Sequence, residues 1–366
     1  MSLVNNGPLS DVLAGFAARI AAATGAQRAL CIRAGGSKDF YGNTPHGEIL
    51  DPRDWSGIES YEPSELVITV RAGTSLALVE ATLAAQDQVL AFEPPHFGPD
   101  ATIGGCVAAG LAGPRRASAG LYGGGLRDFV LGARMLDGRA RLLRFGGTVI
   151  KNVAGYDMAR VLAGSMGTLG LIVDVSLKVL PRPRLETTLR YALDESAALD
   201  ALHEWGGRPL PLSASAWESG QLTLRLSGSS SAVQAAAAQL GGEAVDARQA
   251  SDFWRELREQ RAAWFAASGP LWRLSVPSTA PPLRLAGEQL IEWGGGLRWL
   301  RTQLPAAAIR ARAAELGGHA TLFRGGDRTQ GVFTPLPTAI LAIHRRLKAQ
   351  FDPAGIFNPG RLVPGL

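Results

Sequence analysis

Hydrophobic positions in the first half of the chain alternate between short apolar runs and stretches with helical spacing. The short runs predict buried strands over residues 29–32, 66–70, 131–136, 139–145 and 169–180. Helical spacing predicts one helix that carries Leu13, Phe16, Ile20 and Ala23, a second that carries Leu76, Leu78, Val79 and Leu83, and a third over residues 103–109. Ser10 and Thr74 stand where the N-caps of the first two helices are expected. This order of strands, loops and helices is typical of an α/β unit.

The pattern changes after Pro181-Arg182-Pro183-Arg184, which indicates a domain boundary. Beyond it, the sequence predicts strands over residues 185–191, 222–226, 271–276 and 321–323, and helices over residues 197–205, 231–240, 305–316 and 338–351. Trp254 and Trp264 are expected on one further helix, partly in the core and partly at an interface. The element order indicates a small α+β unit with an antiparallel sheet, followed by a turn-rich tail.

Composition and charge restrict the class of protein. With 366 residues, 46% of them hydrophobic and 19% charged, the chain can bury a sizeable core of one or two domains. The net charge is a mild +5, and the basic clusters at residues 115–116 and 344–346 do not alternate with aromatic residues. Nucleic-acid binding is therefore disfavoured, and an anionic cofactor or an acidic partner protein explains the excess more simply.

The two cysteines argue against a metal cluster in this chain. Cys31 and Cys106 lie in apolar contexts and lack any CxxC or Cys/His spacing, so they are expected to be small buried hydrophobic residues. An iron–sulfur cluster usually takes four cysteines. The N-terminus has no signal-peptide pattern and no apolar run is long enough to span a bilayer, so a cytoplasmic location is expected.

Three glycine-rich segments lie beside these apolar runs, at residues 33–38, 101–105 and 164–170. Glycine permits positive φ and a close approach of the backbone to a ligand, and successive backbone N–H groups can hold an anion. Each segment alone is also explained by a tight turn or by core packing. The three segments taken together, in this order, instead favour one extended ligand with an anionic centre and a flat ring, such as a dinucleotide.

The three glycine-rich segments, in this order along the chain, resemble those of the flavoenzymes with the vanillyl-alcohol-oxidase, or PCMH-type, FAD-binding fold. The resemblance covers residues from about 10 to 182 and the tail sequence Phe-Asp-Pro-x-x-Ile-Phe-Asn-Pro-Gly-Arg. It implies an α+β protein with a PCMH-type FAD-binding domain of two α/β subdomains over residues 1–182. A reduced α+β cap or interface domain is then expected over residues 183–325, and a C-terminal segment over residues 326–366 that packs back on the FAD domain.

The resemblance also implies which residues contact the cofactor. These are Arg33, Ala34, Gly35, Gly36, Ser37 and Lys38 in the first segment, Thr102, Ile103, Gly104, Gly105, Ala108 and Gly110 in and after the second, and Gly167, Thr168, Gly170 and Ile172 in the third. Members that attach FAD covalently often carry His after the Gly-Gly pair, where this chain has Ser37. We therefore expect FAD to be bound non-covalently.

Residues 110–116 and 318–324, together with the chain length, resemble the E subunits of bacterial glycolate oxidase, also called glycolate dehydrogenase. This implies a complex with a homologous larger FAD subunit and an iron–sulfur subunit, peripheral at the inner membrane, that oxidises the 2-hydroxy acid glycolate to glyoxylate and passes electrons through flavin. Two alternatives stay open. The chain could be a stand-alone FAD-dependent D-2-hydroxy-acid dehydrogenase, or a non-catalytic assembly subunit that keeps FAD as a structural element.

Four residues are candidates for catalysis: His96, Lys151, Tyr156 and His319. His96 follows a Pro-Pro turn that the resemblance places just ahead of the flavin-facing segment, although a surface turn explains it equally well. Residues 151–157 resemble a stretch shared by glycolate- and D-lactate-oxidising members, and an ion pair between Lys151 and Asp157 is the alternative. His319 begins a degraded version of a late metal-binding motif with no second His, so no metal site is predicted. A histidine bonded to backbone at a helix exit explains His319 as well.

Overall fold

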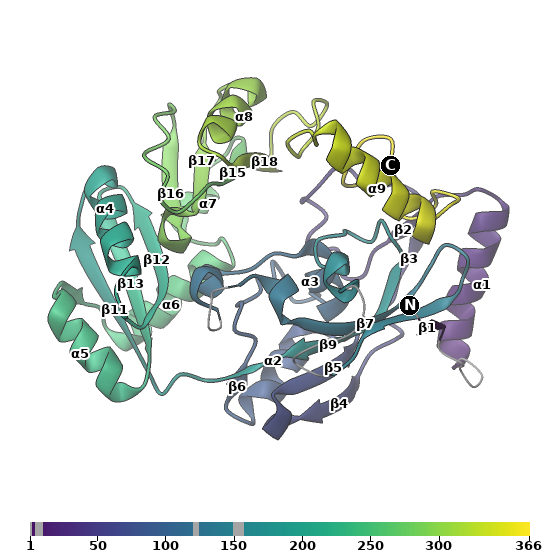
Figure 1. The fold of residues 1–366 in the computed structure, drawn as a ribbon, viewed down its shortest axis with the longest axis horizontal. Helices are drawn as coiled ribbons and strands as arrows, with labels where there is room; N and C mark the ends of the chain where they lie inside the picture. Colours follow the sequence, from purple (N-terminus) through teal and green to yellow (C-terminus); the bar gives the residue numbers. More distant parts are fainter. Residues whose placement is uncertain (1, 4–9, 120–123, 149–156) are drawn as a thin grey trace.

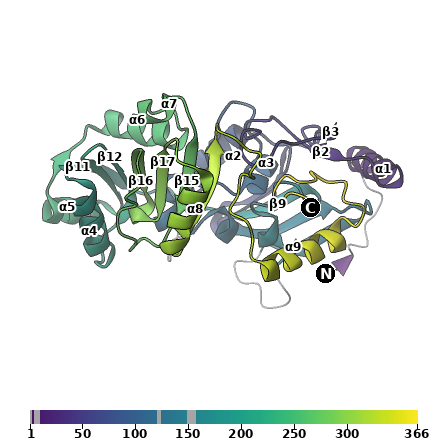
Figure 2. The same cartoon turned by 90° about the horizontal axis from the view of Figure 1, so that it is seen from above.

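The computed structural model describes residues 2–3, 10–119, 124–148 and 157–366. A six-stranded and an eight-stranded sheet lie side by side along the long axis of the molecule (Figure 1). The chain builds the six-stranded sheet first, then the eight-stranded sheet, and finally returns to the first with helix α9 (Thr338–Phe351). Seen from above, the two sheets remain separate bodies joined at one interface (Figure 2). This arrangement confirms the predicted α+β architecture with a returning C-terminal segment.

The six-stranded sheet is antiparallel throughout. Its order is β1 (Ser2–Leu3), β8 (Leu142–Gly146), β7 (Val130–Leu136), β9 (Leu171–Lys178), β5 (Val67–Arg71) and β4 (Ile58–Glu62). One face packs against α2 (Leu76–Ala84) and α3 (Ile103–Ala109), and the other against α1 (Asp11–Gly25) and the C-terminal tail. Because both faces are covered, nearly every residue of the central strand β9 is buried, including the polar residues Asp174 and Ser176.

Short elements complete this half. The parallel pair β2 (Leu30–Ile32) and β3 (Glu48–Leu50) flanks the sheet, and β6 (Gln88–Val89) pairs with β10 (Leu180–Pro181). The 3-10 turns are η1 (Pro63–Glu65), η2 (Pro114–Ser118), η3 (Leu126–Phe129), η4 (Ala159–Leu162) and, in the second half, η5 (Trp293–Gly295).

The predicted helix caps need correction. Ser75, not Thr74, caps α2, because its side chain accepts a hydrogen bond from the backbone N–H of Leu78 at 3.2 Å. The Thr74 hydroxyl instead bonds the backbone of Gly57 and Arg71. Leu78 is half exposed and does not belong to the buried face of the helix. Ser10 occupies the N-cap position of α1 as predicted, but its side chain makes no capping bond.

The eight-stranded sheet is also antiparallel throughout, as predicted for the second half. Its order is β14 (Glu243–Ala244), β11 (Leu185–Ala192), β13 (Gln221–Gly228), β12 (Leu212–Glu218), β16 (Glu288–Glu292), β17 (Leu297–Arg301), β15 (Leu271–Ser275) and β18 (His319–Arg324). The sequence patterns missed β12, β14, β16 and β17. Helices α4 (Glu195–Gly206), α5 (Ser230–Leu240) and α8 (Ala306–Glu315) pack on its outer face.

The inner face of this sheet carries a cluster of aromatic residues. Trp254 and Trp264 lie on two different helices, α6 (Ala247–Arg258) and α7 (Ala263–Ala266), so the prediction of one helix was wrong. Both side chains are buried in a cluster that also contains residues of the first half. The Trp254 indole N–H donates to Thr188 Oγ1 at 2.9 Å, which anchors α6 on the sheet.

Candidate functional site

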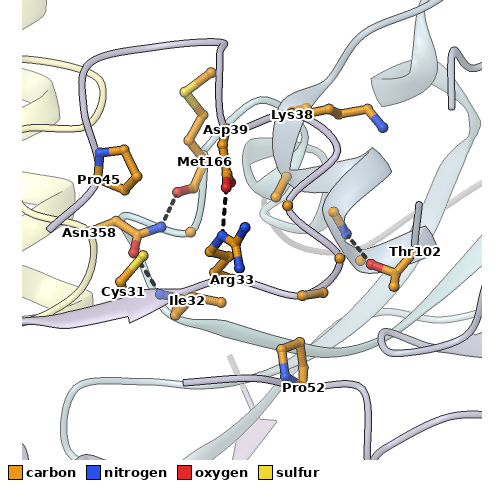
Figure 3. A pocket seen from close by; sticks show the side chains of 18 of the residues that line it. Cys31, Ile32, Arg33, Lys38, Asp39, Pro45, Pro52, Thr102, Met166 and Asn358 are labelled. Carbon is orange, nitrogen blue, oxygen red and sulfur yellow. Dashed lines mark hydrogen bonds and ion pairs between the residues drawn. The ribbon is translucent and has the colours of Figure 1, made fainter. Parts of the chain in front are cut away.

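A cleft opens where the first glycine segment, the N-terminal end of α3 and the third glycine segment meet the C-terminal tail (Figure 3). About 850 Å³ of space not filled by atoms lies in this cleft, the open solvent at its mouth included. Most of the predicted cofactor residues line it: Arg33, Ala34, Gly35, Gly36, Ser37, Lys38, Thr102, Gly104, Gly105, Ala108, Gly167, Gly170 and Ile172. Segments that are more than a hundred residues apart therefore converge on one cavity, as the spacing of the glycine segments indicated.

The loop after β2 presents a row of backbone donors. Within the described part of the chain, the N–H groups of residues 34–38 have no hydrogen-bond acceptor, whereas the N–H of Asp39 donates to Gly36 O at 3.0 Å. Gly36 has a φ of +68°, which turns the loop back on itself. Arg33 pairs with Asp39 at 2.6 Å across this turn. Consecutive unpaired N–H groups beside a guanidinium fit a pyrophosphate.

Two glycines are required by the packing of the loops around the cleft. A Cβ atom on Gly35 would lie 1.8 Å from the carbonyl oxygen of Asp100, and one on Gly104 would lie 2.7 Å from the Cβ of Ala72. Both neighbours are backbone or short side chains that cannot move aside. Gly35 therefore lets the first loop approach the segment that leads into α3, and Gly104 lets α3 approach the residue after β5. Both glycines line the cleft.

Three predicted contact residues lie outside the lining of the cleft. Ile103 is fully buried in the core beneath α3. Gly110 ends α3 in a left-handed conformation, and a Cβ there would lie 2.8 Å from the backbone of Gly164. The Thr168 hydroxyl donates to Ser165 O at 2.7 Å within its own turn. These residues shape the cleft without reaching it.

The C-terminal tail supplies residues that the sequence reasoning missed. Asn358 and Arg361 both line the cleft, in the tail motif already noted for its resemblance. Arg361 donates to the carbonyl groups of Lys38, Asp39 and Asn43, at 3.3 Å for Lys38 and 3.2 Å for Asp39. The buried ammonium of Lys348 on α9 donates to Thr168 O at 2.8 Å and Phe357 O at 2.7 Å. The tail thus holds the first and third glycine segments in place.

Other missed residues complete the lining: Cys31, Ile32, Asp39, Tyr41, Pro45, Pro52, Ala72, Asp100, Ala109, Met166 and Leu171. No sequence pattern marks these residues as ligand contacts; they line the cleft because of where the neighbouring segments place them. Both cysteines are free and buried, as predicted. Burial raises the pKa of Cys106 to about 12, so this thiol stays neutral.

His96 lies beside the cleft but does not line it. Its ring Nε2 contacts Glu80 Oε2 at 3.0 Å, and its backbone N–H donates to Glu259 Oε2 at 3.1 Å. Its carbonyl oxygen accepts a hydrogen bond from Lys38 Nζ at 3.1 Å. Burial lowers the pKa of Lys38, against the opposing effects of Cys106 and Glu259. His96 therefore occupies a turn that positions Lys38, which extends away from Arg33 in Figure 3.

The remaining candidates for catalysis are Lys151, Tyr156 and His319. Lys151 and Tyr156 lie outside the described residues. Asp157 forms an ion pair with Arg160 at 2.9 Å. His319 follows α8 and begins β18, and among the described residues its side chain makes no hydrogen bond to the backbone. The residue as a whole is exposed, but desolvation of its ring, and then the charge of Arg273, lower its pKa. Among the described residues, no three His, Cys, Asp or Glu side chains gather as a metal site.

Comparison with known proteins gives the family context. A family model for an FAD binding domain matches residues 14–146, which include the first two glycine segments. Over 337 residues the chain is 48% identical to the glycolate oxidase subunit GlcE of Escherichia coli (strain K12), covering 92% of this chain and 93% of that protein. The predicted FAD cofactor is therefore confirmed.

Two further relatives match a shorter region. The glycolate oxidase subunit GlcD of Bacillus subtilis (strain 168) is 31% identical over 147 residues, which cover 40% of this chain and 30% of that protein. A D-lactate dehydrogenase of Anaerostipes hadrus is 31% identical over 138 residues, covering 38% of this chain and 28% of the other. A solved alkyldihydroxyacetonephosphate synthase superposes with a TM-score of 0.64 at 14% identity, over 95% of this chain and 75% of that one. That likeness shows a shared fold.

Proposed function

Because this chain belongs to the family of the glycolate oxidase subunit GlcE, we propose that it is an FAD-binding subunit of a multi-subunit glycolate oxidase. In this proposal, the complex oxidises glycolate to glyoxylate, and electrons leave through flavin to an iron–sulfur partner. The observation that carries it is similarity along nearly the whole chain, over 92% of this protein and 93% of its relative. Both sheets are therefore shared with a glycolate oxidase subunit, in addition to the FAD-binding half.

The cleft fits FAD in three respects. The N–H groups of residues 34–38, together with Arg33, suit the pyrophosphate. The glycine segments allow a ring to approach the backbone. Arg361 and Asn358 hold the first and third glycine segments, which line the cleft, in place. When bound, FAD would supply the acceptor for one hydride, that is, for two electrons and one proton. Ser37 offers a hydroxyl 3.3 Å from Lys38 Nζ and no imidazole or thiol, which supports non-covalent binding. Release of yellow cofactor on acid precipitation, against its retention on the polypeptide, tests that point.

The partners follow from the same proposal. Since this chain has two cysteines, both buried and free, an iron–sulfur centre must be carried by another subunit. We assign residues 1–182 and 326–366 to cofactor binding and residues 183–325 to the cap or interface, with a homologous larger FAD subunit as the second partner. In the described part of the chain, no helix is long and apolar enough to cross a membrane. We place the complex in the cytoplasm, peripheral at the inner membrane.

The test is anaerobic addition of glycolate to the isolated chain and to the co-expressed complex, with the absorbance of each flavin followed separately. We expect the isolated chain to retain FAD and the complex to bleach and pass electrons onward. A purified chain that shows no flavin absorbance and no affinity for FAD contradicts the proposal. Loss of FAD from a Gly36 and Ser37 variant that still assembles, with electron transfer intact, indicates a non-catalytic assembly subunit.

The stand-alone dehydrogenase is the second candidate. One observation bears on it: the D-lactate dehydrogenase match covers only 38% of this chain, so the similarity does not extend across both sheets. Rapid turnover of a 2-hydroxy acid by the isolated chain with an artificial acceptor would favour this candidate over a complex.

A further inference from the structure

Residues 183–325 bury two carboxyl groups, those of Glu292 and Glu259. Glu292 stays within its own sheet, where it accepts a hydrogen bond from the Trp299 indole N–H at 2.7 Å. Glu259 follows the last turn of α6 and reaches into the other half of the molecule instead. Its side chain is only 6% exposed, so the groups around it, and not water, fix its position.

The partners of Glu259 are backbone N–H groups of a turn in the cofactor half. Its Oε2 accepts the N–H of Phe97 at 2.9 Å and the N–H of His96 at 3.1 Å. Arg258 Nε donates to the Oε1 of the same carboxylate at 2.8 Å. Arg258 also pairs with Glu80 on α2 at 3.5 Å, and His96 Nε2 contacts the other oxygen of Glu80 at 3.0 Å. The end of α6 is therefore bonded both to this turn and to α2.

Phe97 has an unfavourable backbone conformation that the bond to Glu259 helps to hold. Its φ is +55°, in the left-handed region that a residue with a bulky side chain seldom adopts. Such a conformation persists where the surrounding contacts over-determine it, and it is typical of functional sites. The Phe97 ring packs edge-on against Phe40, with ring centroids 5.3 Å apart. The carboxylate thus fixes the strained residue of the turn at its own N–H group.

The same turn holds Lys38, the last residue of the first glycine segment. Lys38 Nζ donates to the carbonyl oxygen of His96 at 3.1 Å and stands 5.7 Å from the centre of the Phe97 ring. Lys38 also belongs to the lining of the cofactor cleft. A cation that is already held in place binds an anionic ligand at a lower entropic cost than a mobile one. The turn therefore pre-organises an ammonium group in the wall of the cleft.

Glu259 does not line the cleft, and the described lining includes no residue from 183–325. We propose that Glu259 is nevertheless a positioning residue for FAD: by accepting the N–H groups of His96 and Phe97, it fixes the turn that holds the Lys38 ammonium. Hydrogen bonds from an ammonium to an anionic cofactor are strong only where the geometry is set. The inference rests on FAD binding alone, and not on the oxidation of glycolate or on a complex.

The inference makes FAD binding sensitive to the second half of the molecule. Gln260, the residue after Glu259, accepts a hydrogen bond from Arg324 on β18 at 3.0 Å. The end of α6 is therefore tied to the eight-stranded sheet on one side and to the turn on the other. A shift of that sheet relative to the first half would withdraw the carboxylate from the turn and release Lys38.

The test is titration of the full-length chain, from which FAD has been removed, with FAD, followed by flavin fluorescence. Glu259→Ala should weaken FAD binding at least tenfold, because the turn loses its acceptor. Lys38→Met should also weaken FAD binding at least tenfold, because the ammonium itself is removed. In the Lys38→Met background, Glu259→Ala should have a further effect of less than threefold, since both residues act through one contact.

Two further variants separate positioning from a general loss of structure. Glu259→Gln keeps an oxygen that can accept the N–H groups of the turn, so it should bind FAD within threefold of the parent chain. Glu256→Ala is the matched control, because Glu256 lies on the same helix and pairs with Arg261 at 2.9 Å within its own half. It should leave FAD affinity unchanged.

Three results overturn the inference: parent-like FAD affinity of the Glu259→Ala protein, parent-like affinity of the Lys38→Met protein, or additive losses in the double variant. If Glu259→Ala does not fold, Glu259→Asp takes its place, because its carboxylate is one methylene shorter and falls short of the turn. Failure of the proposed function is distinguishable, since the titrations would give the expected affinities while the complex fails to oxidise glycolate.

Discussion

The side chain of Asn358 joins the tail to the strand that leads into the cofactor loop: its Oδ1 accepts the backbone N–H of Ile32 at 2.7 Å, although the two residues are 326 positions apart. Its Nδ2 donates to Met166 O at 2.6 Å (Figure 3). One amide therefore ties together the first glycine segment, the third glycine segment and the end of the chain.

Asn358→Ala should lower FAD affinity at least tenfold and destabilise the fold by about 1–3 kcal/mol, because two buried backbone groups lose their partners. Flavin retention after dialysis and urea unfolding measure the two effects. Gln350→Ala, an exposed position on α9, is the matched control and should change neither quantity. An Asn358→Ala protein that retains FAD as the parent does would show that the tail is dispensable for the cleft.

Gly35→Ala should abolish FAD binding, because the new Cβ would lie 1.8 Å from Asp100 O. Either the first loop or the loop at Asp100 must then move, and both line the cleft. The control is Gly15→Ala on the exposed side of α1, where a Cβ meets nothing within 4 Å. That change should stabilise the protein by about 0.5–1 kcal/mol, because alanine favours a helix over glycine. Flavin absorbance per chain and urea midpoints separate the two results.

Glu93 holds the two halves of the molecule together through charge. Its carboxylate accepts hydrogen bonds from Arg225 Nη2 at 2.8 Å and from the backbone N–H of Arg115 at 3.0 Å. Burial acts to raise the pKa of Glu93, but Arg225 and Arg115 outweigh it, and the pKa is lowered.

Glu93→Gln should destabilise the protein by about 3 kcal/mol, because Arg225, only 6% exposed, would lose its counter-charge. Glu288→Gln is the control. Glu288 pairs with Arg301 at 2.9 Å but is 67% exposed, so this substitution should lower the free energy of unfolding by less than about 1 kcal/mol. Urea unfolding of both variants measures the difference. Equal effects would mean that the Glu93 cluster contributes no more than a surface pair.

Glu292→Gln should stabilise the protein at pH 8 and have little effect at pH 4. The folded protein holds the Glu292 proton up to about pH 7, whereas the unfolded chain releases it near the usual value of 4.5. The folded state then binds more protons, so stability falls as pH rises from about 4.5 to 7 and stays low above that. A pKa rise of this size corresponds to about 3 kcal/mol. Glutamine keeps an acceptor for Trp299 and carries no charge.

Urea unfolding at pH 4, 6 and 8 follows this prediction. The parent protein and the Glu292→Gln variant should converge at the lowest pH and diverge as pH increases. Parallel stability curves across this range would show that the Glu292 carboxyl titrates in the folded state as it does in the unfolded chain.

Local sequence located the three glycine segments that line the cofactor cleft, but not the tail residues Asn358 and Arg361. Three short-range patterns were found where the structure has them. They are a strand that leads into Arg33-Ala34-Gly35-Gly36, a helix that begins after Thr102, and a third segment with Gly167. Helix α9 also matches its predicted bounds, because its apolar positions repeat with helical spacing. The cap of α2 was misplaced by one residue, since Thr74 and Ser75 are both good capping residues and only the backbone path chooses between them.

The proximity of Glu292 and Arg273 depended on tertiary structure. Strands β16 and β17 lack a clear period-two pattern, because Arg298 is buried and bonded to the carbonyl groups of Gly295 and Ala280. Without these strands, nothing in the sequence places Glu292 near Arg273. The register of non-adjacent strands sets which side chains share a face, and register is fixed by the packing of the whole sheet. Asn358 and Ile32 meet for the same reason: a long-range contact is decided by the fold, whereas a glycine turn is decided by its own residues.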